Sequence, residues 1–244
     1  MTKLLNFSLI EIEKCHSTNA MMTELIRNNT AEEGTVLRAD YQSKGKGQRE
    51  NTWQSNKDEN LLFSLCLSPK ILPLKNIFHL TIITSLALIE TLNHYKVQAS
   101  IKWPNDIYVD DNKICGVLIE NILKGNRLEK SIIGIGLNVN QKDFGELSAS
   151  SIYLESSHKE NISNVLDVFL KFIKKYYTFL LNEEMSLLMK LYHLYLYQRN
   201  KWANYNDGED FKGKITGVNE NGLLEVEKKS GDTFFYSLKE IKFI

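Results

Sequence analysis

SIKWPNDIYVDDNKICGVLIENIL, residues 100–123, consists of three strand-like runs separated by a Pro-Asn-Asp turn and an Asp-Asp-Asn turn. Short runs of this kind, joined by tight turns, predict an antiparallel meander. SIIGIGLNVNQ, residues 131–141, adds a further strand with two internal glycines. Glycine weakens a strand interior unless something approaches the backbone closely. Gly116, Gly134 and Gly136 therefore suggest that a ligand lies against this sheet.

Further strands and helices are predicted on the N-terminal side of this meander. Alternating or apolar runs predict strands over residues 7–14, 34–42 and 60–68. A helical run, AMMTELIRNN (20–29), follows CHSTN, whose Thr or Asn is expected to cap its first turn. Residues 77–94 are apolar nearly all round, which is typical of a buried helix.

The second half of the chain changes from helices to short strands. Apolar residues recur at helical spacing from Val165 to Tyr176, and MSLLMKLYHLYLYQRNKW (185–202) predicts another helix. From about Lys201 onward, short runs alternate with tight turns, which is typical of a small β-barrel module. We therefore predict an α+β protein, with a mixed β-sheet flanked by helices in residues 1–198 and a small barrel in residues 199–244.

Composition excludes several classes of protein. The chain has 244 residues, 43% of them hydrophobic, so it can bury a core of ordinary size. Its 30 basic and 30 acidic side chains cancel, so no global field attracts nucleic acid or an anionic membrane. A signal peptide is lacking, and no apolar run reaches the roughly 18 to 20 residues that span a bilayer. We expect a cytoplasmic protein with no nucleic-acid or membrane partner. Three scattered cysteines argue against a disulfide framework or a zinc site.

A glycine-rich basic loop, KGKGQR (44–49), precedes Trp53. Glycines beside cationic residues at a strand end can present backbone N–H groups and positive charge to an anion. The loop matches neither the GxxxxGK(S/T) of nucleotide hydrolases nor the GxGxxG of dinucleotide folds, so alone it is better explained as a solvated turn. Trp53, an aromatic suited to stacking on a base, and the polar cluster of KWPND with Lys113 favour a ligand site instead.

Four motifs in order give the chain a resemblance to the biotin protein ligases. ADYQSKGKGQRENTW (39–53) is similar to their AExQxxGRGRxxxxW segment, and CHSTN (15–19) is similar to their DSTN. KWPNDIYVDDNKICGVLIE (102–120) resembles KWPNDxxxxxxKxxGxLxE, and GIGLNVN (134–140) resembles GIGxNxN. The resemblance implies a class II synthetase-like biotin/lipoyl ligase catalytic domain followed by an SH3-like C-terminal domain.

The reaction that this resemblance implies uses ATP and biotin as substrates, with Mg²⁺. The biotin carboxylate attacks the α-phosphate of ATP, and a lysine of a biotin carboxyl carrier protein domain then accepts the biotinyl group. By match to the family, Lys113 contacts the biotin carboxylate and the α-phosphate and is the main catalytic residue. Without the resemblance, Lys113 is explained at least as well as an edge lysine at the end of a strand.

The resemblance also implies binding residues. Biotin contacts are assigned to Ser17, Thr18, Asn19, Gln42, Lys113 and Gly116. ATP or adenylate contacts are assigned to Gly45, Lys46, Gly47, Gln48, Arg49, Trp53, Asn105, Asp106 and Asn138. Asp106 is expected to steer Mg²⁺ or the incoming amine, with no metal centre of the protein's own. Some of these residues have simpler explanations as helix caps, turn residues or, for Trp53, as a core residue.

Residues 44–52 are expected to form a lid, mobile without ligand and ordered over biotinyl-AMP, because water hydrolyses an acyl-adenylate. Where the family has GRGRRGR, Lys46, Gln48 and Glu50 replace Arg, Arg and Gly, which removes positive charge and weakens the expected affinity for phosphate. Because only 14 residues precede CHSTN, we expect no N-terminal DNA-binding domain of the kind that some family members carry.

Alternative functions stay open at the level of sequence. Lipoate ligases and octanoyltransferases share the catalytic fold, and an octanoyltransferase needs a nucleophilic cysteine. Cys115 is near Lys113, but it lies within the apolar run ICGVLI, where a buried thiol is inert. A non-catalytic biotin-binding module is the third alternative, although it would need neither Lys113 nor the glycine loop. The oligomeric state is a monomer or a homodimer, the latter through edge pairing of residues 113–123.

Overall fold

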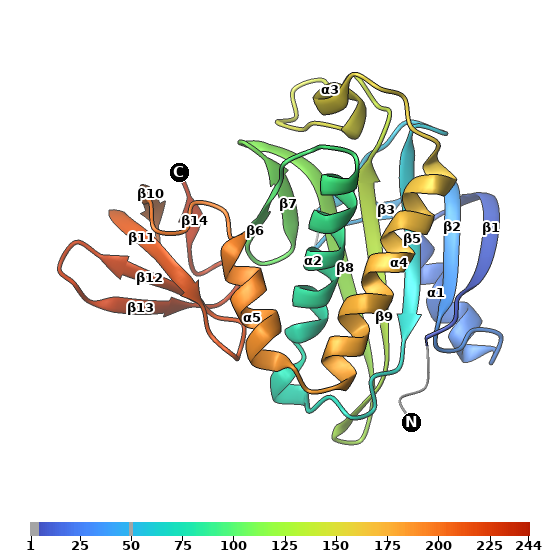
Figure 1. Cartoon of the computed structure of the whole chain (residues 1–244), viewed down its shortest axis with the longest axis horizontal. Coiled ribbons are helices and arrows are strands. Elements are labelled where there is room, and N and C mark those ends of the chain that lie inside the picture. The colour runs from blue at the N-terminus through green and yellow to red at the C-terminus, as the bar shows by residue number, and fades with distance from the viewer. Residues whose placement is uncertain (1–4, 49–50) are drawn as a thin grey trace.

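The computed structural model describes residues 5–48 and 51–244, which form two main β-sheets, with helices around the larger one (Figure 1). The larger sheet has seven strands in the order β1-β2-β5-β9-β8-β7-β6. These strands are β1 (Ser8–Cys15), β2 (Thr35–Gln42), β5 (Asn60–Leu67), β6 (Ser100–Lys102), β7 (Asp106–Val109), β8 (Asn112–Lys124) and β9 (Arg127–Asn138). The helical elements are α1 (Thr18–Arg27), the 3₁₀ turn η1 (Leu74–Asn76), α2 (His79–His94), α3 (Ile152–Ser156), α4 (Ile162–Leu181) and α5 (Met185–Leu194).

Strand pairing in the larger sheet is mixed. β1 and β2 run parallel, with α1 as the crossover between them, whereas every other neighbouring pair is antiparallel. The predicted meander is confirmed, because β6, β7, β8 and β9 are consecutive in the chain and adjacent in the sheet. β7 pairs with β8 only as far as Gly116. Residues 117–124 of β8 therefore have β9 on one side and no strand of the described chain on the other.

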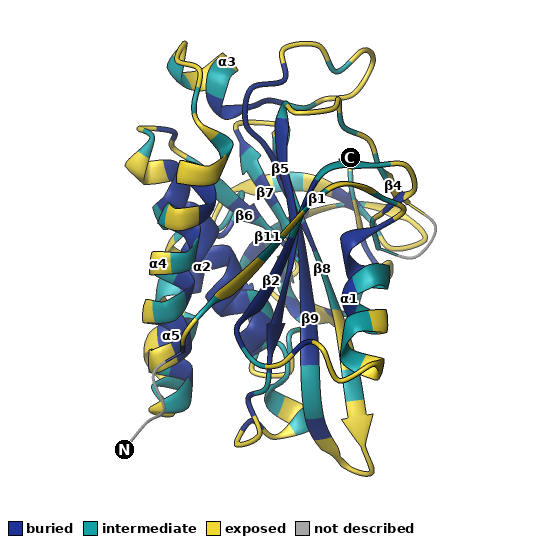
Figure 2. Ribbon diagram, turned by 90° about the vertical axis from the view of Figure 1, so that its right-hand side faces the viewer, coloured by how far each residue is buried: buried dark blue, intermediate teal, exposed yellow. Residues whose placement is uncertain are grey.

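The two faces of the larger sheet are covered unequally (Figure 2). α2, α4 and α5 lie on one face, and α1 covers part of the other. Because alternate residues of a strand point to opposite faces, Leu65 and Ile133 pack in the large core with α2 and α4, whereas Cys66 and Ile132 pack with α1. α2 is buried on nearly all sides, as its apolar sequence predicts. No helix in the described part of the chain combines the length and the apolar character of a membrane span.

The smaller sheet follows α5 and is antiparallel throughout. Its strands are β10 (Trp202–Asn206), β11 (Asp210–Val218), β12 (Leu224–Lys228), β13 (Thr233–Tyr236) and β14 (Lys242–Phe243), in the order β13-β12-β11-β10-β14. Tyr205, Ile215 and Val226 belong to a core that is continuous with that of the larger sheet. The α+β class, with a mixed sheet flanked by helices and a separate small β domain, is thus confirmed. The division between residues 198 and 199 falls between α5 and β10 and stays a prediction.

Some predicted element boundaries are wrong. α1 begins at Thr18 rather than Ala20, so the N-cap is Ser17, which makes no side-chain capping bond. α5 ends at Leu194 because the next segment pairs with β6: the Ile101 N–H donates to the Tyr195 carbonyl at 2.7 Å. The short elements α3 and β10 have no clear pattern in the sequence and were not predicted.

Two histidines, the buried His79 and the half-buried His193, make stability depend on pH. His79, at the start of α2, and His193, near the end of α5, each have a pKa that is lowered chiefly by burial. As the pH falls through the ordinary histidine pKa of about 6.5, the unfolded chain therefore binds more protons than the folded chain. We expect their contribution to the free energy of unfolding to be full above that pH and to decrease from there down to the lowered pKa of the folded state. Urea unfolding between about pH 8 and pH 5 measures this decrease.

Variants test whether His79 and His193 cause this pH dependence of stability. The double variant His79→Gln, His193→Gln lacks both groups, so its stability is expected to change less with pH over this window. The matched control is His94→Gln, because His94 is exposed and its loss is expected to leave the slope unchanged. A double variant with the wild-type slope would show that other groups cause the dependence.

Candidate active site

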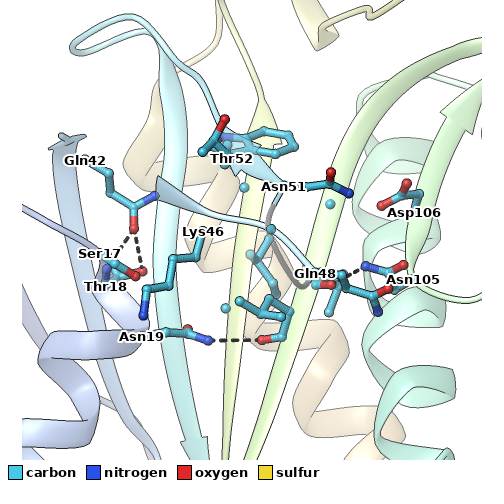
Figure 3. Close-up of a pocket in the computed structure, with 18 of the residues that line it drawn as sticks. Ser17, Thr18, Asn19, Gln42, Lys46, Gln48, Asn51, Thr52, Asn105 and Asp106 are labelled. Carbon is cyan, nitrogen blue, oxygen red and sulfur yellow. Dashed lines mark hydrogen bonds between the residues drawn. The ribbon is translucent and has the colours of Figure 1, made fainter. Parts of the chain in front are cut away.

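A cavity of about 260 Å³ opens on the face of the larger sheet that α1 only partly covers (Figure 3). β8 and β9 contribute its floor, and the N-terminal end of α1 contributes one wall together with Gln42 at the end of β2. A hairpin of β3 (Gly45–Lys46) and β4 (Thr52–Trp53) contributes another wall. In Figure 3, the turn that carries Asn105 and Asp106 lies across the cavity from α1. Leu238, in the loop between β13 and β14, also lines the cavity.

The α1 side of the cavity contains a polar network. Ser64 Oγ, on β5, lies 2.8 Å from Thr18 Oγ1 and 2.6 Å from Asn19 Oδ1. Asn19 Nδ2 donates to Glu120 Oε2 at 2.7 Å and to the Leu118 carbonyl at 3.2 Å. Both amide hydrogens of Asn19 are therefore bonded to the protein, and its carboxamide is held in one orientation.

The same end of α1 orients Gln42. The Thr18 backbone N–H donates to Gln42 Oε1 at 2.7 Å, and the Thr18 hydroxyl donates to it at 3.2 Å. Because the carboxamide oxygen of Gln42 is occupied in this way, its Nε2 hydrogens are the group that it can offer to a ligand. This wall is therefore suited to bind a carbonyl oxygen.

Glycines let side chains lie directly against the floor of the cavity. A Cβ on Gly134 would be 2.3 Å from Asn19 Oδ1, and a Cβ on Gly136 would be 2.4 Å from Cε2 of Trp53. Both distances are far shorter than van der Waals contact, so any larger residue would displace these side chains. Protein side chains therefore make the close approach at these strand glycines, and the ligand contact that the glycines suggested stays a prediction.

Lys113, at the start of β8, places its ammonium at the cavity. Lys113 Nζ is 2.7 Å from Asp106 Oδ1 and 5.7 Å from the centroid of the Trp53 ring. A Cβ on Gly116 would be 3.2 Å from Lys113 Cε, so glycine at this position makes room for the lysine. The side chains of Lys113 and Asp106 are 33% and 23% exposed, so solvent screens the pair in part and a ligand can reach it.

The backbone of Lys113 is fixed on both sides. Its N–H donates to the Ser148 carbonyl, and its carbonyl accepts from the Ser150 N–H, each at 3.0 Å. Asn138 supports this arrangement, because its Nδ2 donates to the Ser150 carbonyl at 2.9 Å. Asn138 is buried and does not line the cavity, so its contact with adenine stays a prediction.

The hairpin carries the basic loop singled out in the sequence. Gly45 pairs with Trp53, and Lys46 pairs with Thr52. Gly45 lines a second cavity of about 820 Å³, which shares part of the hairpin with the first. Arg49 lies outside the described residues. The hairpin therefore contributes to the lining of both cavities.

The structure brings most of the predicted site residues to one place. The cavity lining includes Ser17, Thr18, Asn19, Gln42, Lys46, Gly47, Gln48, Trp53, Asn105, Asp106, Lys113 and Gly116. Gly45 and Asn138 lie outside this lining. The roles of all these residues in binding stay predictions.

Sequence reasoning missed three residues that shape the cavity. Ser64 is the lone hydroxyl in the buried run LLFSLCL, and Glu120 is the acid that ends the matched motif GVLIE. Both residues therefore carried a usable signal. Leu238 had none, because its contact joins segments that are far apart in the sequence.

The described residues at the cavity do not form a metal centre of their own. No group of three or more His, Cys, Asp or Glu residues in the described chain is placed to hold a metal ion. Asp106 is the one carboxylate among the described lining residues, and it pairs with Lys113. A single carboxylate suits Mg²⁺ that is held mainly by nucleotide phosphates, and it does not suit a resident metal ion.

The thiol of Cys115 takes no part in the site. Cys115 is fully buried in the large core, and burial raises the pKa of its thiol far above the usual range. Such a thiol does not ionise at neutral pH and is a poor nucleophile. The prediction that Cys115 packs as a small hydrophobic residue is confirmed.

Comparison with known sequences identifies relatives across nearly the whole chain. Residues 12–138 match the family model of the biotin/lipoate A/B protein ligase family. The chain is 33% identical to the bifunctional ligase/repressor BirA of Bacillus spizizenii, over 97% of this chain and 74% of that protein. It is 26% identical to the biotin–protein ligase of Homo sapiens, over 95% of this chain and 33% of that protein.

A solved structure supports the same conclusion. The biotin protein ligase from Aquifex aeolicus, determined in complex with biotin and ATP, matches with a TM-score of 0.81 at 27% sequence identity. The match covers 96% of this chain and 97% of that one, and so includes both sheets. The chain therefore belongs to the biotin/lipoate A/B protein ligase family, among the biotin protein ligases.

Proposed function

We propose that this protein activates biotin with ATP as biotinyl-5′-AMP and transfers biotin to a lysine of a biotin carboxyl carrier protein domain of a biotin-dependent carboxylase. One observation carries the proposal: a single cavity combines a carboxamide wall, at Asn19 and Gln42, with the ammonium of Lys113. Biotin has a ureido carbonyl at one end and a carboxylate at the other, so its two polar ends match these two groups. The related Aquifex aeolicus enzyme was solved with biotin and ATP.

The first step forms a mixed anhydride. A carboxylate oxygen of biotin attacks the α-phosphorus of ATP, the bond to the bridging β-phosphate oxygen breaks, and pyrophosphate leaves with the electron pair. The Lys113 ammonium stabilises the negative charge that builds up on the α-phosphate oxygens. Asp106 holds this ammonium in place before ATP enters. Catalysis then rests on positioning and charge, with no covalent intermediate on the protein.

The second step is aminolysis. The amine of the carrier lysine attacks the carbonyl carbon of the anhydride, and AMP leaves with the electrons of the broken C–O bond. The amine loses one proton to water as the amide forms. Asp106 is the residue that we assign to orient this amine, because it is the carboxylate nearest Lys113.

The nucleotide is assigned to the hairpin side of the cavity. Trp53 presents an aromatic ring there, and its buried Nε1 has no hydrogen-bond partner in the described chain. Lys46 and Gln48 provide a charged and a polar side chain for the phosphates. Mg²⁺ would enter with ATP, bound chiefly by phosphate oxygens. Whether the protein acts as a monomer or a homodimer stays a prediction.

Exchange of labelled pyrophosphate into ATP tests the proposal, with biotin, lipoate and octanoate measured in parallel. Exchange with biotin alone supports it, and a Cys115→Ala variant is expected to exchange at the wild-type rate. Exchange with lipoate would instead indicate a lipoate ligase. With no exchange for any acid, the ligase assignment would be wrong, and octanoyl transfer that is lost in Cys115→Ala would indicate an acyltransferase.

Ligand is expected to protect the hairpin from trypsin. Lys44 and Lys46 are exposed, and cleavage beside them requires the hairpin to open. At about 100 times its dissociation constant, biotinyl-AMP is expected to slow this cleavage by up to about 100-fold, because it binds the closed form. Lys124, the exposed last residue of β8, provides the internal control, since its cleavage rate should not change. Equal cleavage of the hairpin with and without ligand would contradict the lid hypothesis.

A further inference from the structure

The two residues before Pro104 both contact the smaller sheet. Trp103 Nε1 donates to the Gly222 carbonyl, in the turn between β11 and β12, at 2.9 Å. Lys102 Nζ lies 5.1 Å from the centroid of the Phe243 ring on β14. β6, which ends at Lys102, is the edge strand of the larger sheet on the side of the smaller sheet (Figure 1). The turn that leads into Asp106 is therefore attached to the smaller sheet at its first residue, Trp103.

Three aromatic rings surround the Lys102 ammonium. Its Nζ lies 4.2 Å from the ring centroid of Tyr108 on β7 and 5.5 Å from that of Tyr197, in the segment after α5. Phe243 provides the third ring. All three distances are in the range of cation–π attraction. We call Lys102 and these three aromatic residues the Lys102 cage. Its members come from β6, β7, the segment after α5 and β14.

Keeping the Lys102 ammonium inside the cage costs desolvation free energy. No carboxylate of the described chain lies within 4.0 Å of Lys102 Nζ. Burial lowers the pKa of Lys102, while the charges of Asp106 and Asp111 act in the opposite direction. A methionine would fill the same aromatic space without the desolvation of a charge. Packing alone therefore does not account for a lysine here.

Asp106 links the caged lysine with the lysine at the cavity. Lys102 is the register partner of Asp106 across β6 and β7, and Asp106 Oδ1 is 2.7 Å from Lys113 Nζ. We infer that Lys102 is a positioning residue: through Asp106, the Lys102 cage fixes where the Lys113 ammonium lies, so the smaller sheet helps to set the geometry of the catalytic group. This inference rests on the proposed function.

Lys102→Met removes the charge and keeps the volume. The kcat of biotin-dependent pyrophosphate exchange is expected to fall about 10- to 100-fold, with KM for biotin and ATP within about threefold, because small displacements of a catalytic group have effects of this size. Lys102→Arg keeps a cation over the rings and is expected to restore kcat to within about threefold of the wild type. The matched control is Lys214→Met. Lys214 also lies over a ring, 5.2 Å from that of Trp202, but outside the cavity lining, and its loss should leave kcat unchanged.

A double-mutant cycle tests the route through Asp106. In an Asp106→Asn background, Lys102→Met is expected to lower kcat by less than about twofold, because the ion pair between residue 106 and Lys113 is already lost. An equal loss in both backgrounds would overturn this route, and a Lys102→Met variant with wild-type kcat would overturn the inference itself.

Amide hydrogen exchange of the free protein tests the cage without any assay of activity. Residues 103–109 are expected to exchange faster in Lys102→Met than in the wild type or Lys214→Met, while α2 and α4 stay protected. Unchanged exchange in residues 103–109 would refute the inference, and so would faster exchange throughout the chain, which indicates general destabilisation. A wild type that shows no biotin-dependent pyrophosphate exchange would refute the proposed function instead, and the amide exchange would still decide on the cage.

Discussion

Replacing Lys113 by alanine is expected to lower the rate of biotin-dependent pyrophosphate exchange by about 10²- to 10³-fold, the usual effect of removing a preorganised charge donor. The Lys113 ammonium is 2.7 Å from Asp106, and hydrogen bonds on both sides fix its backbone. Lys46, the other lysine among the described lining residues, is on the hairpin and forms no ion pair with a described residue. It is therefore not expected to replace Lys113. Steady-state exchange kinetics measure the loss, and urea unfolding shows whether the variant is folded.

Lys113→Arg is the informative companion variant. A planar guanidinium presents its charge differently from a compact ammonium, so arginine is expected to restore little of the rate. Lys124→Ala, at the exposed C-terminal end of β8, is the control for loss of a lysine on the same strand and should be fully active. Exchange by Lys113→Ala at more than about one tenth of the wild-type rate would contradict the catalytic assignment.

Gly134→Ala is expected to reduce the free energy of unfolding by about 1 to 3 kcal/mol, the usual range for overpacking a tight site. The new Cβ would lie 2.3 Å from Asn19 Oδ1 and 2.8 Å from its Cγ. Asn19 cannot withdraw without breaking its bonds to Ser64 and Glu120. Because we assign the same carboxamide to the biotin wall, we expect biotin affinity to fall by at least about tenfold. Urea unfolding and calorimetric titration with biotin measure the two effects.

The cause of that loss is tested in an Asn19→Ala background. There the added methyl group meets no carboxamide, so Gly134→Ala is expected to have a much smaller effect on stability than in the wild type. An equal cost in both backgrounds would mean that contact with Asn19 is not the reason for glycine at this position.

Short-range patterns predicted the fold well. Tight turns and alternating apolar residues are local features, so β6 to β9 and the helix at His79–His94 could be predicted from sequence alone. The ends of α1 and α5 could not, because long-range contacts decide them. α5 ends where Tyr195 begins to bond with Ile101, a residue that is distant in the sequence.

The candidate site was predictable to the extent that its residues lie in recognisable motifs. Residues of CHSTN, KWPND and the glycine strands lie at one cavity, as the family resemblance implied. The contacts of Leu238 and of the Lys102 cage could not be predicted, because they join elements that only the folded chain brings together. Ser64 had a usable signal in its apolar strand but was not predicted. Asn138 shows the converse, since it matches a motif yet lies outside the cavity lining.

The glycine floor restricts how the acid selectivity of such an enzyme can change. At Gly134 and Gly136 the backbone itself forms the surface, so any substitution there reduces the volume of the cavity and cannot simply reshape it. New selectivity for a longer or differently substituted acid must then arise in the walls, where side chains such as Gln42 and those of the hairpin can be exchanged. Directed evolution toward other acids is therefore expected to accumulate substitutions in these walls and to leave the floor unchanged.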